Sequence, residues 1–146
     1  MKATKSALIL KDFTILNSKC EVIPFDNAKG KDFKETQDSF PIEIDFGIQE
    51  DKDETLVFVK VSINSEKESG YSIFSEGVGL FCFDKSQDLS LDERKGLIQF
   101  SAVSICITNI RAYIANITSY YPFGKFNFAS IDMNELLKQK ISKKDS

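Results

Sequence analysis

The longest apolar stretch of the chain lies between residues 89 and 121, and its pattern predicts a helix over Leu91–Ser119. The helix begins at a capping box, in which Ser90 and Glu93 each bind a backbone N–H of the first turn. Pro122 ends it, and Gly96 is the one glycine inside it. At about 1.5 Å per residue, such a helix is roughly 40 Å long.

Apolar residues occupy two stripes of this helix. One stripe consists of Ile98, Ala102, Ile105, Asn109 and Ala112, and the other of Phe100, Val103, Ile107, Ile110, Ile114 and Ile117. A helix that is apolar nearly all round must be buried nearly all round. One side can cover a sheet, so we expect the other side to meet a second copy of the chain. The expected oligomer interface comprises Phe100, Val103, Ile107, Ile110 and Ile114.

The helix has two other interpretations. It could be the core helix of a monomer, with no partner chain. It could also be a membrane span, but Gln99, Asn109 and Arg111 interrupt its apolar run, so we expect no membrane insertion.

Four segments ahead of the helix have the pattern of strands. They are Phe13–Ile23, Ile42–Ile48, Thr55–Ile63 and Tyr71–Phe83. The third is apolar on both faces in its first half, which is typical of a central or covered strand. The first changes parity along its length, which indicates a bulge or a strand that is exposed on changing faces. Gly77 and Gly79 share one face of the fourth, where we expect a bulge, a bend or a close neighbour.

The remaining segments complete the predicted fold. Residues 1–11 are expected to be a frayed or helical lead-in, and the polar stretch 26–39 to be a loop. Segment 120–129 is so aromatic that its rings must either pack on the body or flank a groove. A short helix over Met133–Ile141 follows, with a lysine-rich tail that suits its C-terminal end. We therefore predict an α+β domain spanning residues 1–146, with a four-stranded antiparallel sheet, one long helix and a short C-terminal helix.

Composition narrows the classes of function. The chain has 146 residues, 42% of them hydrophobic, and a net charge of −3, without a basic stripe before its last residues. This argues against nucleic-acid binding. The absence of histidine removes His-based triads, His metal sites and the usual proton shuttle. We expect no catalytic residues, no cofactor and no metal.

The cysteines and the N-terminus bear on the compartment. Cys20, Cys82 and Cys106 are scattered, which is typical of reduced thiols in a cytosol rather than of a zinc site. The apolar patch Ala7–Leu10 is too short for the core of a signal peptide. A cytoplasmic location is therefore expected.

Several motifs, in order, resemble SecB, the bacterial protein-export chaperone. They are Phe13-Thr14-Ile15, Phe40-Pro41-Ile42-Glu43-Ile44-Asp45, Gly79-Leu80-Phe81, Arg111 late in the long helix, Pro122-Phe123-Gly124, and Ile131-Asp132-Met133-Asn134-Glu135-Leu136. The resemblance covers the chain from Phe13 to about Leu137.

The resemblance implies an ATP-independent holdase, not an enzyme, that binds unfolded client polypeptides in apolar grooves. It also implies a homotetramer, a dimer of dimers in which edge strands pair within dimers and long helices pack between them. Transferred by position, the groove residues are Phe13, Ile15, Phe40, Ile42, Ile44, Tyr121, Phe123, Phe126, Phe128 and Leu137.

The departures from SecB shape the functional hypothesis. SecB has an acidic tail that helps dock the translocase motor ATPase, whereas this tail is rich in lysine, which argues against coupling to secretion. SecB-like chaperones of toxin–antitoxin systems, which protect an antitoxin, are the other model. Two further alternatives remain: an oligomeric interaction protein without client binding, and a scaffold similar to the hot-dog thioesterases, with Asp45 or Glu76 as its carboxylate.

Overall fold

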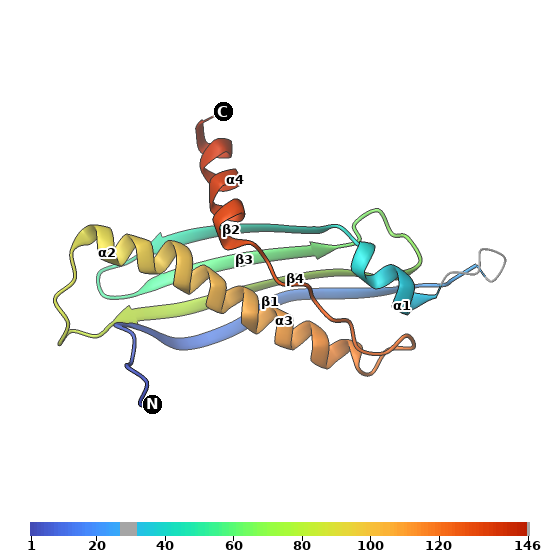
Figure 1. Ribbon diagram of the computed structural model, residues 1–146, viewed down its shortest axis with the longest axis horizontal. Helices are drawn as coiled ribbons and strands as arrows, with labels where there is room; N and C mark the ends of the chain where they lie inside the picture. Colours follow the sequence, from blue (N-terminus) through green and yellow to red (C-terminus); the bar gives the residue numbers. More distant parts are fainter. Residues whose placement is uncertain (27–31, 146) are drawn as a thin grey trace.

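The computed structural model describes residues 1–26 and 32–145. Its centre is a four-stranded antiparallel sheet in the order β1-β4-β3-β2 (Figure 1). The strands are β1 (Leu8–Ile23), β2 (Ile42–Glu50), β3 (Thr55–Ile63) and β4 (Gly70–Phe83). The predicted α+β class is confirmed, because one long helix and a short C-terminal helix follow this sheet.

The long helix spans Leu91–Thr118 and is built from three consecutive parts. These parts are α2 (Leu91–Gly96), the π-helical segment η3 (Leu97–Ala102) and α3 (Val103–Thr118). The Ser90 hydroxyl accepts a hydrogen bond from the Glu93 N–H at 3.1 Å, as the capping motif predicts. By length and composition the helix could cross a membrane, but one side of it is buried against the sheet of its own chain.

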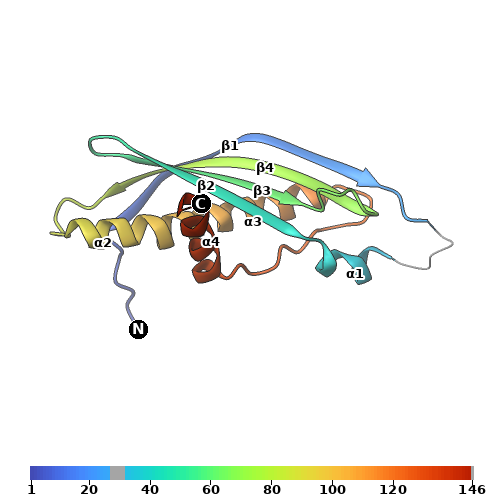
Figure 2. The ribbon, with the colours of Figure 1, turned by 90° about the horizontal axis from the view of Figure 1, so that it is seen from above.

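The helices lie on a single face of the sheet, which we call the inner face (Figure 2). On β3, the inner-face residues Val57, Val59, Val61 and Ile63 have no exposed surface, whereas the alternate residues are partly exposed. We call the opposite side, which faces away from the helices, the outer face. The alternation therefore arises because the long helix excludes water from one face only.

The N-terminal prediction was wrong over part of its length, since β1 begins at Leu8 rather than Phe13. Leu8 pairs with Phe83, and the Ala7 carbonyl accepts a hydrogen bond from the Asp84 N–H at 2.8 Å. The predicted bulge is confirmed, because the register with β4 shifts at two places, between Leu10 and Asp12 and between Ile15 and Asn17.

The two glycines of β4 make room for close neighbours, which is one of the three arrangements expected of their shared face. A Cβ atom on Gly77 would lie 2.6 Å from the Phe13 ring, and one on Gly79 would lie 2.6 Å from the Cys106 sulfur. Both distances are too short for real side chains. Glycine at these positions therefore lets the β1 aromatic ring and the long helix approach the sheet closely.

The connection between the edge strands β1 and β2 contains two short helical segments. The predicted loop 26–39 lies partly outside the described residues, but its second half forms α1 (Phe33–Thr36) and the 3-10 turn η2 (Gln37–Ser39). Asp32 caps α1 by accepting the Glu35 N–H at 2.9 Å. The C-terminal helix α4 (Met133–Asp145) leaves the body beside β2 (Figure 1).

Candidate functional site

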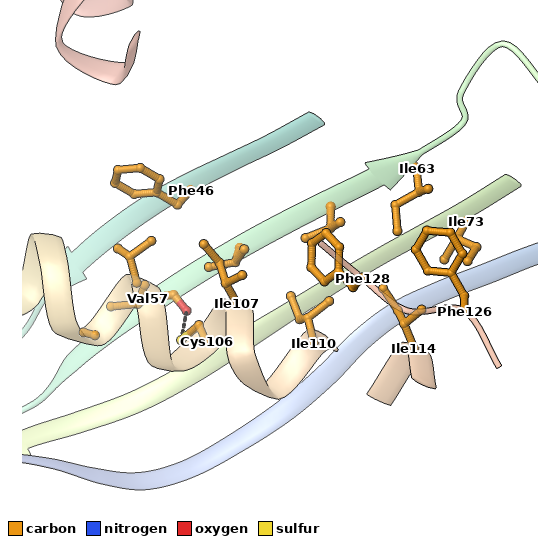
Figure 3. Packing of buried hydrophobic residues seen from close by; sticks show 14 of the residues in the cluster. Phe46, Val57, Ile63, Ile73, Cys106, Ile107, Ile110, Ile114, Phe126 and Phe128 are labelled. Atoms are coloured by element: carbon orange, nitrogen blue, oxygen red, sulfur yellow. Dashed lines mark hydrogen bonds between the residues drawn. The ribbon is translucent and has the colours of Figure 1, made fainter. Parts of the chain in front are cut away.

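The predicted oligomer interface of the long helix lies mostly on the buried side of that helix. Val103, Ile107, Ile110 and Ile114 are buried against the sheet of the same chain (Figure 3). They form the core of the subunit and are unavailable to a partner, which corrects the predicted interface. Of the five predicted positions, Phe100 is the one that stays open to solvent, with 46% of its surface exposed.

The π-helical segment explains this correction. Ile98 and Ala102, which lie in this segment, are buried together with Val103 and Cys106. An extra residue in a helical turn rotates every later position around the axis. The predicted stripe that begins at Ile98 therefore turns away from the sheet after Ala102. The face of the long helix that points away from the sheet, which we call the outward face, carries mainly small residues. That face comprises Ser101, Ser104, Thr108, Ala112 and Ala115.

A cluster of aromatic rings fills one end of the molecule, where α1, the end of β1 and the turn after α3 come together (Figure 1). Its rings lie between 4.8 and 6.4 Å from their neighbours, in edge-on, tilted and stacked arrangements. Such arrangements add stabilisation beyond the area they bury. The cluster consists of Phe25, Phe33, Phe40, Tyr71, Tyr121, Phe123 and Phe126.

Tyr71 holds this cluster to the segment after the long helix. Its hydroxyl donates to the Gly124 carbonyl at 2.8 Å and accepts from the Phe123 N–H at 2.9 Å. Burial is the main cause that raises the pKa of this hydroxyl, so it remains a hydrogen-bond donor at neutral pH. Gly124 has a φ of +81°, which a glycine adopts without strain and which completes the turn that starts at Tyr121.

We call residues 120–129, the segment after the long helix, the linker. Two side chains of the long helix form hydrogen bonds with the rest of this linker. The Thr118 hydroxyl donates to the Ile114 carbonyl and accepts the Phe126 N–H at 2.9 Å. Arg111 donates to the Ala129 carbonyl at 3.1 Å, and its guanidinium lies 5.4 Å from the centre of the Phe128 ring. These bonds place the linker rings against the core (Figure 3).

The structure therefore divides the predicted groove residues by burial. Phe40, Phe126 and Phe128 are 5%, 1% and 7% exposed and belong to the core, so their assignment to a client groove is corrected. The other positions are half-buried or exposed and keep apolar surface at the edge of the core: Phe13, Ile15, Ile42, Ile44, Tyr121, Phe123 and Leu137.

These remaining residues do not form one continuous surface in a single chain. Phe13 and Ile15 lie on β1, at the sheet edge opposite to β2. Ile42 and Ile44 lie on β2, beside which Leu137 of α4 packs on the core. Tyr121 and Phe123 lie at the end of the long helix, in the aromatic cluster. We call the surface of β2 and α4 that includes Ile42, Ile44 and Leu137 the β2 strip.

The C-terminal helix is held to the β2 strip by a polar contact as well. The Lys140 ammonium lies 2.8 Å from the Asp45 carboxylate and 5.1 Å from the centre of the Phe46 ring. The hydrogen bond from Lys140 is the main cause that lowers the pKa of Asp45, with the Phe46 N–H as a further donor. Asp45 is therefore a stable anion engaged in an ion pair, which does not suit a catalytic acid.

Two hollows open on the surface of the described residues. One, of about 340 Å³, adjoins the aromatic cluster and is lined by Phe25, Phe40 and Ile23, among others. The other, of about 610 Å³, lies between the start of the long helix and the β2–β3 turn. Its rim carries as many acidic as basic side chains, so it has no preference for a ligand of one charge.

The described residues offer neither a cluster of metal ligands nor a buried thiol that is activated as a nucleophile. Within residues 1–26 and 32–145, no group of three or more His, Cys, Asp or Glu residues lies close enough together to hold a metal ion. The three cysteines are free, and burial raises the pKa of Cys106 to about 12 and that of Cys20 to about 11. Neither thiol forms a reactive thiolate at neutral pH.

Sequence reasoning missed several residues of the aromatic cluster. Phe33 belonged to the predicted polar loop, Tyr71 to an ordinary strand position, and Phe25 to no predicted element. The available signal was the isolation of Phe33 among charged residues, because a lone aromatic ring in a polar loop needs an apolar partner elsewhere.

No family model and no curated protein matches the sequence. Among solved structures, the chain is similar to the SecB-like chaperone of Mycobacterium tuberculosis in complex with a ChAD peptide from an antitoxin. The TM-score is 0.61 at 13% sequence identity, over 86% of this chain and 91% of that chain. A protein of unknown function from Streptococcus agalactiae matches with a TM-score of 0.42 and 9% identity, over 86% of this chain and 100% of that one. The first likeness shows that the chain has the SecB-like fold.

Proposed function

We propose that this protein is an ATP-independent holdase that binds unfolded polypeptide segments, with an antitoxin-like client. The observation that carries the proposal is the SecB-like fold, shared with a chaperone that was solved with a bound antitoxin peptide. The apolar side chains that the core leaves half-buried, on the β2 strip and at Tyr121 and Phe123, support it further.

The client site in this proposal is the β2 strip together with the open side of the aromatic cluster. Each apolar client side chain buried there contributes about 2 kcal/mol, and ordering the client reduces the total. The few apolar contacts that one subunit offers therefore give weak binding. Linked sites on several subunits raise the effective affinity, because the second contact becomes intramolecular.

We also propose that the subunits assemble into a dimer of dimers, which links their client sites. The outward face of the long helix carries small side chains at Ser101, Ser104, Thr108, Ala112 and Ala115. Small residues let two helices approach closely, so we place the contact between dimers there. The free edge of β1 is the candidate for strand pairing within each dimer.

The assembly is tested by the mass in solution. Ala112→Arg introduces a long charged side chain at an exposed position and should reduce a tetramer to dimers, while Asp88→Arg in the loop ahead of the helix should not. Multi-angle light scattering measures both. An Ala112→Arg variant with the mass of the wild type would contradict packing through the outward face.

Client binding is tested by suppression of aggregation of a chemically unfolded protein, followed by light scattering. The wild type should suppress aggregation at a near-stoichiometric ratio without ATP. Tyr121→Ser should weaken suppression, because Tyr121 borders the aromatic cluster with 36% of its surface exposed. Tyr120→Ser is the matched control, since that ring is 85% exposed and makes no ring contact among the described residues. No suppression by the wild type would favour an interaction protein without client binding.

The proposal places the protein in the cytoplasm and requires no nucleotide, cofactor or metal. It does not include docking of the translocase motor ATPase. The C-terminal helix presents Lys138, Lys140 and Lys143 where SecB has an acidic tail.

A further inference from the structure

The outer face of the sheet carries an apolar patch that no described element covers. Leu56 and Phe58 of β3 pair in register with Leu80 and Val78 of β4. All four side chains lie outside the hydrophobic core cluster, and each keeps some exposed surface. Figure 2 shows the helices on the opposite face. We call these four residues the outer patch.

The outer patch is bordered by two opposite charges on the same two strands. Lys60 of β3 lies beside Glu76 of β4, one step further along the same face. Neither takes part in an ion pair among the described residues, whereas Asp45, the neighbour of Lys60 on β2, is engaged by Lys140. The border thus presents one free cation and one free anion side by side.

This pattern is self-complementary. A two-fold axis parallel to the strands and midway between β3 and β4 would place β3 of one copy opposite β4 of the other. Lys60 then faces Glu76 of the second copy, Phe58 faces Val78, and each contact occurs twice. Two sheets that pack in this way keep their strands nearly aligned, at about 10 Å from each other.

We propose that the outer patch is an interface with a second copy of this chain, arranged by this two-fold axis. The inference is independent of the proposed client binding, because it uses the opposite face of the sheet. An unrelated protein is the other conceivable occupant, but the paired charges favour a second copy, since each charge meets its opposite without any further partner.

The size of the patch determines how strong this contact is. The paired part of β3 and β4 is nine residues long, or roughly 30 Å, and the four strands span roughly 15 Å between the outer two. The area that this face can bury is therefore smaller than that of a standard interface, which is about 800 Å² per partner. Association through this face should be weak and should depend on protein concentration.

Charge reversal tests the arrangement. Lys60→Glu and Glu76→Lys each place like charges opposite one another, so each single variant should weaken the association about tenfold or more. The double variant restores unlike pairs and should recover it. Lys52→Glu, in the exposed β2–β3 turn, is the control with the same change of charge. Sedimentation equilibrium over a wide concentration range gives the association constant, and circular dichroism verifies the fold.

The measurement is made in the wild type and in the Ala112→Arg variant, so that loss of helix packing and loss of this contact are distinguishable. Val78→Lys, within the outer patch, provides a second disruption that does not depend on Glu76. Equal association constants for the wild type, Lys60→Glu and Val78→Lys would overturn the proposal. So would a double charge reversal that fails to recover association while its fold is intact.

Discussion

The strongest test of the structure concerns Phe126, which sequence analysis assigned to a client groove and the structure assigns to the core. Its side chain is 1% exposed, and its ring lies 6.3 Å from that of Phe40 and 6.4 Å from that of Phe33. Its N–H donates to the Thr118 hydroxyl. The perturbation is Phe126→Ala, which removes the ring and keeps the backbone bond.

The expected loss of stability follows from burial. Truncation of a fully buried Phe to Ala costs about 3–5 kcal/mol, including the cavity that remains. Against a typical free energy of unfolding of about 5–15 kcal/mol, this is a large fraction. At roughly 3 °C per kcal/mol for a domain of this length, the melting temperature should fall by roughly 10–15 °C.

The assay is urea unfolding followed by circular dichroism, at one fixed protein concentration because assembly of subunits also contributes to apparent stability. Tyr121→Ala is the matched control from the same linker, with a ring that is already 36% exposed. We expect it to cost about 1 kcal/mol or less. The two aromatic residues should therefore differ by several-fold in their effect on unfolding.

The refuting result is equally specific. If Phe126→Ala lowers the free energy of unfolding by less than about 1 kcal/mol but abolishes suppression of client aggregation, the ring lines a groove and the core assignment is wrong.

Three further predictions concern local contacts. Thr118→Val, which keeps the shape but removes a buried acceptor, should cost about 1–3 kcal/mol in urea unfolding; an unchanged midpoint would count against the bond. Gly79→Val should cost about 1–3 kcal/mol by overpacking against Cys106, and the Gly79→Val, Cys106→Ala double variant should recover part of the loss. Lys140→Met should remove a small pH dependence of the free energy of unfolding. The native pKa of Asp45 lies below its ordinary value of 3.8. The ion pair therefore stabilises the fold above about pH 4, and this contribution is lost as the pH falls through the native pKa. The ion pair is exposed, so the effect is at most about 1 kcal/mol, and identical acid unfolding curves for the wild type and Lys140→Met would refute it.

The sequence by itself determined the four strands, the long helix and the C-terminal helix, and their order. The capping box at Ser90, the proline at position 122 and the period-two alternation of β2 are local signals, and each one marks a boundary or a face that the structure confirms. The paired glycines of β4 predicted a bulge, a bend or a close neighbour, and the structure shows close neighbours there, the Phe13 ring and Cys106. These predictions succeeded because they depend on backbone geometry and on neighbours close in the chain.

The tertiary structure decided which apolar residues are core and which remain at the surface. The π-helical segment between Leu97 and Ala102 turned the stripe with Val103, Ile107 and Ile110 toward the sheet, and helical periodicity cannot show such an inserted residue. Likewise, Phe33 and Phe126 are 93 residues apart in the chain, yet they share one aromatic cluster. Burial depends on contacts between distant segments, so composition shows how much apolar surface the chain has, and only the packed fold shows where it remains open.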